Sequence, residues 1–271
     1  MNQPLPLSPA EMYERHFVPA MFRPWSALLL RHAAIQPGAR VLDVACGTGI
    51  VAREAAPLVG EGGQVVALDM NPAMLAVGRS LPAPAGAAID WREGNAMALP
   101  FADRSFDTVL CQHGLQFFPD RVGALREIRR VLATGGRVQV MVLQALALHP
   151  VFEVLMTAVA HHLELPIDAV MTPFDLPESE ALRTLLVASG FPSAEVLPVS
   201  TTVRFPDAER FVPLAVASSA AAVPAFAQLT APARAALLDA VRLDVEPMVA
   251  RYRDAGGVAF PMWAHVGIGR I

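Results

Sequence analysis

The chain has 271 residues and a formal net charge of −4, enough length for one large α/β domain or a core with a lid. The charge gives no basic field for nucleic acid. Its 21 positive residues are all arginine, which excludes lysine Schiff-base chemistry and a Walker A lysine. Hydrophobic residues make up 54%, yet no uninterrupted apolar stretch reaches the ~18 residues of a membrane span.

The N-terminal segment is expected to be helical over residues 10–34, although no clean apolar stripe runs through it. Residues 1–9 lack the basic region and apolar core of a signal peptide, so the expected location is the cytoplasm. A turn at Pro37-Gly38 closes the segment.

A strand, a tight turn and a helix follow over residues 40–56 and resemble the start of a nucleotide-binding βαβ unit. In such a unit the glycines let a ligand approach the backbone, and the helix N-terminus offers free N–H groups. Gly47, Gly49 and Ala52 fit the dinucleotide pattern, and Asp69 lies twenty residues past Gly49, where a ribose-binding acid belongs. Spacing alone therefore allows NAD.

Asp43, inside the first strand, argues against NAD. A carboxylate within a parallel strand is costly unless something pairs with it. A pyrophosphate would add negative charge nearby, whereas S-adenosylmethionine (SAM) carries an ammonium and a sulfonium that would relieve the cost.

The residues of this turn also carry a family resemblance. The run Asp43-x-Ala45-Cys46-Gly47-Thr48-Gly49 resembles motif I of the class I SAM-dependent methyltransferases, in the branch of the ubiquinone/menaquinone-biosynthesis C-methyltransferases. The resemblance implies that these residues hold SAM and that S-adenosylhomocysteine is the product.

The second expected strand, residues 64–69, ends at Asp69, one crevice over from the glycine turn. There the carboxylate can accept hydrogen bonds from both ribose hydroxyls. An N-cap role for Asp69 is disfavoured because Asn71-Pro72 already supplies the next helix start. The resemblance places Met70 and Met74 beside the adenine, although either methionine would also suit the core.

A third strand is expected over residues 87–92, and the stretch after it resembles the family's G-D-A-x-x-L-P-F. The aspartate of that pattern bonds the adenine amino group. Here it is replaced by Asn95, between Gly94 and Ala96. An asparagine keeps one acceptor and gains a donor, so it can still meet the adenine edge.

The fourth expected strand, residues 105–113, ends in Gln112 and His113, at the edge where ligands of open α/β sheets bind. We assign Gln112 to the cofactor. His113 is the candidate general base and a substrate contact, provided its imidazole is neutral and within reach of the acceptor. The alternative is a histidine that packs and bonds a backbone group.

The resemblance also implies that the N-terminal helices fold over the cofactor and line the substrate pocket. We expect Tyr13, Phe17 and Phe118 there; simple packing of the cap by its aromatic residues is the alternative. Cys46 and Cys111 are expected near the crevice as small apolar residues rather than reactive thiols.

The later elements follow more weakly from the pattern. Gly135-Gly136 is expected to end a helix over 121–132 that Asp120 caps, before a fifth strand over 137–142. The remaining expected elements are helices over 150–165, 178–189 and 207–251, an extended stretch over 194–205 broken at Pro198, and a strand over 258–268.

The resemblance implies an α/β fold: a Rossmann-like, seven-stranded, mostly parallel sheet of order 3-2-1-4-5-7-6 with an antiparallel last strand and a helical lid. Residues 1–37 would form an N-terminal helical cap and residues 38–145 the SAM-binding core. Residues 146–271 would supply the late strands and lid insertions of one compact domain. His161 and His162 are adjacent and cannot share a helix face, and no other cluster has ligand spacing, so no metal is expected.

These features favour a methyltransferase that moves the methyl group of SAM to an O, N or C atom of a small, apolar or aromatic molecule by in-line displacement. Positioning alone can supply ~7–11 kcal/mol of such a barrier, so no single side chain need be indispensable. The alternatives are an NAD-linked oxidoreductase and a non-catalytic SAM-fold binding protein. The expected partners are a small molecule and at most a second copy of the chain, with no nucleic acid and no membrane span.

Overall fold

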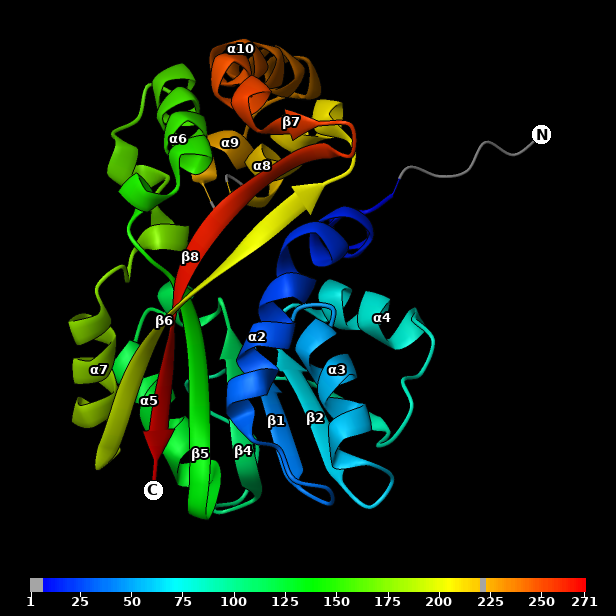
Figure 1. Ribbon diagram of the computed structural model, residues 1–271, viewed down its shortest axis with the longest axis vertical. Coiled ribbons are helices and arrows are strands. Elements are labelled where there is room, and N and C mark those ends of the chain that lie inside the picture. The colour runs from blue at the N-terminus through cyan, green and yellow to red at the C-terminus, as the bar shows by residue number, and fades with distance from the viewer. Residues whose placement is uncertain (1–6, 220–222) are drawn as a thin grey trace. The chain divides into compact units, whose positions relative to one another are not determined.

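One mixed β-sheet organises the part of the chain that the computed structural model describes, residues 7–219 and 223–271 (Figure 1). Its strands run in the order β3-β2-β1-β4-β5-β8-β6, and β7 pairs with β8 outside this path. The expected order is confirmed, because the short strand β7 only shifts the label of the last strand, and the sheet includes an antiparallel strand. The α/β, Rossmann-like fold class is confirmed with it.

The strands are β1 (Arg40–Val44), β2 (Gln64–Asp69), β3 (Ile89–Glu93), β4 (Phe106–Gln112), β5 (Leu132–Leu143), β6 (Ser193–Phe205), β7 (Arg253–Asp254) and β8 (Gly257–Arg270). The α-helices are α1 (Pro9–Met12), α2 (Arg23–Ala33), α3 (Ile50–Val59), α4 (Pro72–Ser80), α5 (Arg121–Val131), α6 (Pro150–His162), α7 (Ser179–Ala188), α8 (Ala208–Ser219), α9 (Pro224–Ala227) and α10 (Ala231–Val249). The other helices are the π-helix η1 (Tyr13–Phe22) and the 3-10 turns η2 (Leu115–Phe117), η3 (Leu146–Leu148), η4 (Ile167–Ala169), η5 (Thr172–Phe174) and η6 (Ala250–Tyr252).

The central strands place the ligand edge of the sheet. β1 pairs in parallel with β2 on one side and with β4 on the other, so the strand order reverses between β1 and β4. Both faces of these strands are covered, which explains their apolar runs. Open α/β sheets bind ligands at such a reversal, beyond the carboxyl ends of the strands. The candidate site therefore lies where β1, β2 and β4 end.

Two helix starts confirm the capping signals of the sequence. Asn71 accepts hydrogen bonds from the backbone N–H groups of Ala73 and Met74 at the start of α4, and Asp120 accepts one from Gly123 at the start of α5. Both side chains satisfy amides that have no partner within the helix. The helices α2 and α3 pack against each other and against central strands (Figure 1).

Two local expectations are wrong. Gly135-Gly136 does not separate the helix from the strand, because α5 ends at Val131 and β5 begins at Leu132; the extra residues are absorbed in an irregularity opposite residues 106–108 of β4. Pro198 does not break the extended stretch, because it lies within β6. β6 is an edge strand, where a missing N–H costs no ladder bond if it points outward.

The N-terminal segment is helical as expected, but its middle is the ten-residue π-helix η1, with Pro19 inside it. In a π-helix the hydrogen bonds run from i to i+5, which widens each turn. Apolar side chains therefore fall out of the 3.6-residue period, and this explains why the sequence shows no clean stripe. π-Helical turns are rare and occur frequently at functional sites.

The chain divides into two compact units. The first comprises residues 1–142, 178–199 and 265–271, and the second comprises residues 143–177 and 200–264. That these units form one domain, with the helices of the second as a lid, stays a prediction. The first six residues, on which much of the signal-peptide expectation rests, lie outside the described residues.

The second unit has an aromatic core of its own, in which Phe152, Phe211 and Phe260 pack with ring centroids 5.4–6.4 Å apart. The same unit contains a buried histidine, His149, whose two ring nitrogens both contact the backbone. Its Nδ1 lies 3.0 Å from the Ala145 carbonyl oxygen, and its Nε2 accepts a hydrogen bond from the Trp263 N–H at 3.0 Å. Burial lowers the pKa of His149, so the neutral ring is the form that fits these contacts.

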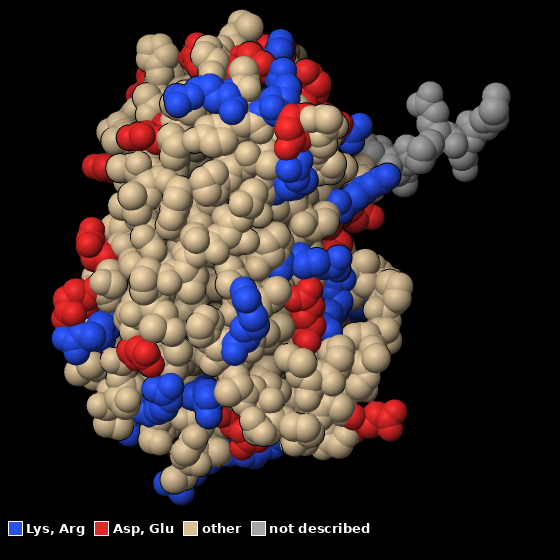
Figure 2. Space-filling model, in the orientation of Figure 1, with Lys and Arg blue, Asp and Glu red and all other residues tan. Residues whose placement is uncertain are grey.

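On the face shown in Figure 2, basic and acidic side chains are interspersed, and no broad basic area is visible. Within the described residues, no helix combines the length and the apolar character needed to cross a membrane.

Candidate functional site

The turn after β1 is held in left-handed backbone conformations. Gly47 and Gly49 have φ values of 58° and 81°, and Ala45, which carries a side chain, has a φ of 56°. His113, at the end of the neighbouring strand β4, has a φ of 52°. Non-glycine residues rarely adopt this region, and such strain clusters at active sites and ligand clamps. Two strained residues thus lie at the ends of the strands between which the sheet order reverses.

Asp69 ties the end of β2 to this turn. One carboxylate oxygen accepts the Gly47 N–H at 2.7 Å, and the other accepts the Asn71 N–H at 2.9 Å. The side chain is only partly buried, and each carboxylate oxygen has a further lone pair. Asp69 is therefore oriented by the backbone and can still accept hydrogen bonds from a ligand.

Asp43 lies within β1 and is buried, with 1% of its surface exposed. Its carboxylate accepts the Ala52 N–H of α3 at 3.0 Å. Burial raises its pKa to about 8, the Ala52 hydrogen bond opposes this shift, and the charge of Asp69 adds to it. Among the described residues neither Asp43 nor Asp69 forms an ion pair. The crevice therefore has two acidic side chains, of which Asp43 keeps its proton more readily than usual, and neither is paired with a cation among the described residues.

This donor set fits SAM better than a dinucleotide. The Thr48 hydroxyl in the middle of the turn is buried and has no hydrogen-bond partner among the described residues, which leaves it available to a carboxylate or another polar group of a ligand. The two acids suit an ammonium and a sulfonium, whereas a pyrophosphate would meet uncompensated negative charge. Asp43, Thr48 and Asp69 would hold the cofactor together with the backbone of the turn.

The residues expected around the adenine lie on the loops after β2 and β3. Met70 is 75% exposed and Met74 partly exposed. The Gly94 N–H donates to the Asp69 carbonyl at 3.0 Å, so this loop is joined to the ribose-binding acid. Asn95 is exposed and its Oδ1 accepts the Met97 N–H at 2.9 Å, while Ala96 is buried. The asparagine oxygen therefore shapes the loop by accepting a backbone N–H.

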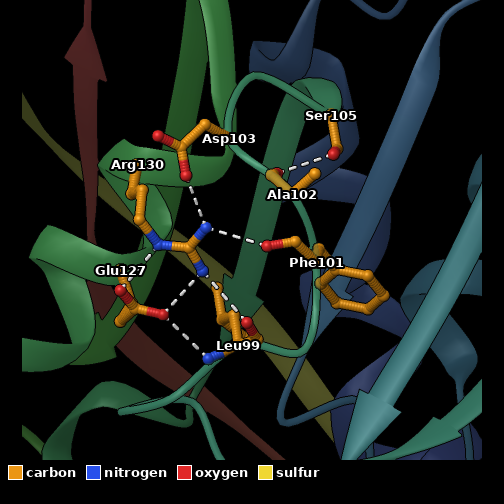
Figure 3. A network of polar contacts seen from close by, with 7 residues as sticks. All are labelled: Leu99, Phe101, Ala102, Asp103, Ser105, Glu127 and Arg130. Carbon is orange, nitrogen blue, oxygen red and sulfur yellow. Dashed lines mark hydrogen bonds and ion pairs between the residues drawn. The ribbon is translucent and has the colours of Figure 1, made fainter.

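A polar network fastens the far end of the same loop to α5 (Figure 3). Arg130 donates to the carbonyls of Leu99 and Phe101 at 3.0 and 2.8 Å and also pairs with Asp103 and Glu127. Glu127 in turn accepts the Leu99 N–H at 2.9 Å. Arginine is suited to such planar, multidentate contacts. The local sequence does not indicate these contacts, because Arg130 and the loop residues it binds are about 30 positions apart in the chain.

Aromatic side chains of η1 form a cluster within the first unit. The Tyr13 and Phe22 ring centroids are 5.0 Å apart, and Phe17 lies 6.4 Å from each. The Tyr13 hydroxyl reaches the glycine turn, within 3.5 Å of where a Cβ on Gly47 would lie. Burial and the nearby Asp69 charge raise the pKa of Tyr13, so the phenol is neutral. The structure thus places Tyr13 beside the glycine turn, with Phe17 in the same aromatic cluster, and their contact with a substrate stays a prediction.

Two polar contacts hold η1 against the core, and no local pattern in the chain indicates either of them. The Arg53 Nη2 of α3 donates to both carboxylate oxygens of Glu14, at 2.9 and 3.1 Å, and both side chains are mostly buried. The Gln112 Nε2 donates to the Phe22 carbonyl at 3.0 Å. Gln112 therefore supports the cap, while its Oε1 is buried without a hydrogen-bond partner among the described residues and is available to a ligand.

His113 lies next to this cluster. Its ring centroid is 5.7 Å from that of Trp25 and 6.2 Å from that of Phe22. The Phe118 ring tip lies beside Gly114, 3.6 Å from where a Cβ on that glycine would be. His113 and Phe118 thus both lie near the end of β4, where their roles toward a substrate stay predictions, and Trp25 is a further residue in contact with His113.

The two cysteines have the properties of small, buried apolar residues, as the sequence predicts. Cys46 and Cys111 are buried free thiols. Burial raises the pKa of both, that of Cys111 to about 12. A reactive thiol needs a lowered pKa, so neither is poised as a nucleophile. Within the described chain, no group of three or more His, Cys, Asp or Glu residues is arranged to hold a metal ion.

Comparison with known proteins decides the family. A model of the ubiE/COQ5 methyltransferase family matches residues 18–166, more than half of the chain. The chain belongs to the ubiE/COQ5 methyltransferase family. The family is one of SAM-dependent methyltransferases, which agrees with the donor set of the crevice. This excludes the alternative of an NAD-linked oxidoreductase.

Two curated relatives each match less than half of the chain. A 2-phytyl-1,4-naphthoquinone methyltransferase of Synechococcus elongatus is 37% identical over 123 residues, covering 45% of this chain and 53% of its own. A ubiquinone/menaquinone biosynthesis C-methyltransferase UbiE of Hahella chejuensis is 43% identical over 121 residues, covering 44% and 49%. The chain thus spans about half the length of the curated relatives it matches.

Solved structures agree on the fold. A Haemonchus contortus phosphoethanolamine N-methyltransferase 2, solved in complex with S-adenosyl-L-methionine, superposes with a TM-score of 0.55 at 20% identity, over 96% of this chain and 56% of that one. The ubiE/COQ5 chain therefore shares its architecture with a structure that holds this cofactor.

Proposed function

We propose that this protein transfers the methyl group of SAM to a ring carbon of a small aromatic molecule of the quinone or hydroquinone type. The observation that carries the cofactor part is the pair of acidic residues, Asp43 and Asp69, beside the glycine turn, neither of which forms an ion pair with another described residue. The quinone class comes from the names of the curated relatives, which refer to naphthoquinone and to ubiquinone/menaquinone biosynthesis.

The aromatic cluster supports a flat acceptor. Tyr13, Phe17, Phe22, Trp25 and His113 are linked by ring contacts of 5.0–6.4 Å. Aromatic side chains favour offset or edge-to-face packing with another ring. A planar apolar ring can therefore be held without many polar contacts, and Gln112 Oε1 is available to accept a hydrogen bond from a ring hydroxyl.

The chain's part in the reaction is to bind, orient and exclude water. When bound, SAM supplies an electrophilic methyl group. Asp43 and Asp69 hold the cofactor at the ends of β1 and β2, and the cap residues of η1 cover the turn. Methylation at a ring carbon also releases a proton, and the His113 imidazole, at the end of β4, is the group we assign to accept it. A cytoplasmic location and a homodimer stay predictions.

Transfer of labelled methyl from SAM to a demethylated menaquinone or ubiquinone precursor tests this function. We expect a labelled ring-methylated product that requires both the protein and the acceptor. Phosphoethanolamine serves as the contrasting acceptor, because it has no ring to pack on the aromatic cluster and the cluster contains no arginine to pair with its phosphate. Labelling of phosphoethanolamine but not of the quinone precursors would contradict the proposed acceptor class.

Substitution of His113 tests its role as the base. His113→Asn removes the imidazole while keeping a residue type that tolerates a left-handed backbone, so the strained turn is retained. We expect turnover to fall by about 100-fold, the lower end of the usual contribution of general base catalysis, with the affinity for S-adenosylhomocysteine within about twofold of the parent. Undiminished turnover in His113→Asn would remove the base assignment and leave the cofactor site intact.

A further inference from the structure

Trp91 of β3 fills a space between two glycines that belong to different elements. One is Gly49, the last residue of the glycine turn after β1 (Gly47–Gly49, hereafter the cofactor turn). The other is Gly78, in the interior of α4. A Cβ on Gly49 would overlap the indole, with Cζ3 at 2.6 Å. A Cβ on Gly78 would lie 2.5 Å from both Cη2 and Cζ3. The benzene edge of the indole therefore occupies the position that a methyl group on either glycine would take.

Gly78 also touches the cofactor turn directly. A Cβ at this position would lie 2.9 Å from the Thr48 carbonyl oxygen, closer than side chains normally approach. Glycine within a helix weakens the helix relative to alanine, and Gly78 has no left-handed backbone that would require it. Close approach therefore explains this glycine: α4 lies against the back of the turn, and Trp91 wedges the two together.

Backbone contacts fix the position of Trp91. Trp91 pairs with Ala67 of β2 within the sheet, and its carbonyl accepts a hydrogen bond from Arg79 of α4 at 2.9 Å. The strand, the helix and the turn thus meet at one indole ring, which lies against Gly49, whereas the Tyr13 hydroxyl lies against Gly47. The ligand-facing groups of the turn are the Thr48 hydroxyl and the Gly47 N–H, and their directions depend on how the backbone of residues 47–49 is supported.

We infer that Trp91 is a positioning residue for the cofactor site: its indole sets the backbone of the Gly47–Gly49 turn from behind, and with it the affinity for the adenosyl cofactor. The inference rests on the proposed function, since it takes the turn to be the cofactor site. A binding site held about 1 Å too loosely loses much of its affinity when the residues that support it are altered.

The test uses Trp91→Phe, which keeps an aromatic ring in β3 but removes the outer indole atoms that face the two glycines. We expect the Kd for S-adenosylhomocysteine, measured by calorimetry on the full chain, to rise about tenfold, an effect near 1.4 kcal/mol. The matched control is Phe106→Leu, a buried truncation at the opposite end of β4. The control should lower the Tm comparably and leave the Kd within about twofold of the parent.

Failure of the role of Trp91 and failure of the cofactor assignment give different results. If Trp91→Phe lowers the Tm as the control does but leaves the Kd unchanged, Trp91 only packs and the inference is wrong. If the parent protein itself fails to bind S-adenosylhomocysteine, the proposed function fails instead.

A double-mutant cycle gives a second, independent readout. Gly78→Ala should weaken cofactor binding in the parent protein and do so less in the Trp91→Phe background, because the removed ring atoms free the space for the new methyl group. Equal effects of Gly78→Ala in both backgrounds would show that the indole does not occupy that space. The proposed role of Trp91 in supporting the turn would then be wrong.

Discussion

Replacing Asp69 with alanine is expected to weaken S-adenosylhomocysteine binding by about 100-fold or more. The side chain would accept the ribose hydroxyls, and hydrogen bonds to a charged group contribute about 1.5–3 kcal/mol each. Loss of two such bonds exceeds 1.4 kcal/mol, the equivalent of one tenfold step, at least twice over. The carboxylate also accepts the N–H groups of Gly47 and Asn71, so its removal frees the turn as well.

Asp90 offers a matched control for this substitution. It lies on the neighbouring strand β3 and forms a solvent-exposed pair with Arg92 at 2.8 Å, and such surface pairs contribute little. Asp90→Ala should bind the cofactor product as the parent does. Calorimetric titration measures both variants, and an unchanged Kd for Asp69→Ala would put the ribose contact, and the cofactor assignment with it, in error.

Cofactor affinity is expected to rise with pH up to about 8 and then level off. In the free protein Asp43 has a pKa raised to about 8 by burial, so it is mostly protonated at pH 6. A cationic ligand favours the ionised carboxylate, and binding must therefore release this proton. The Kd for SAM should fall by up to about tenfold for each pH unit between 6 and 8.

The same shift sets the sign of the stability change. The unfolded chain ionises this acid near its ordinary pKa of about 4, whereas the folded chain keeps its proton until about pH 8. Between these values the folded state binds more protons than the unfolded state. The contribution of Asp43 to stability of the free protein is therefore present below about pH 4 and is lost as the pH rises toward 8.

Asp43→Asn isolates this group, since the amide oxygen can still accept the Ala52 N–H. We expect the variant to bind SAM weakly at every pH and to lose the slope between pH 6 and 8. Titrations in buffers of different ionisation enthalpy count the protons released. An identical slope and proton count in Asp43→Asn would assign the pH dependence to another group.

The local signals of the sequence determined the first half of the fold and the cofactor turn. The apolar strand with Asp43, the glycine pair and Asp69 at the end of the next strand all lie close together in the chain and obey short-range rules. The caps at Asn71 and Asp120 were found for the same reason, because a side-chain acceptor and the amides it satisfies are within three residues.

Features that depend on distant partners could not be found in this way. Nothing in the neighbourhood of Trp91 shows that its ring meets Gly49 and Gly78. Glu14 and Arg53 are an ordinary acid and base in sequence, and only the fold makes them a mostly buried pair. The strand continues through Pro198 because β6 is an edge strand, a property of the whole sheet and not of the local residues.

A crystal structure of the chain with S-adenosylhomocysteine bound is the most direct test of the cofactor site. We expect ligand density beyond the carboxyl ends of β1 and β2, with the ribose hydroxyls on Asp69 and the amino-acid ammonium near Asp43. Ligand density elsewhere on the chain, or a crevice that instead accepts the pyrophosphate of a dinucleotide, would contradict the assignment of these two acids.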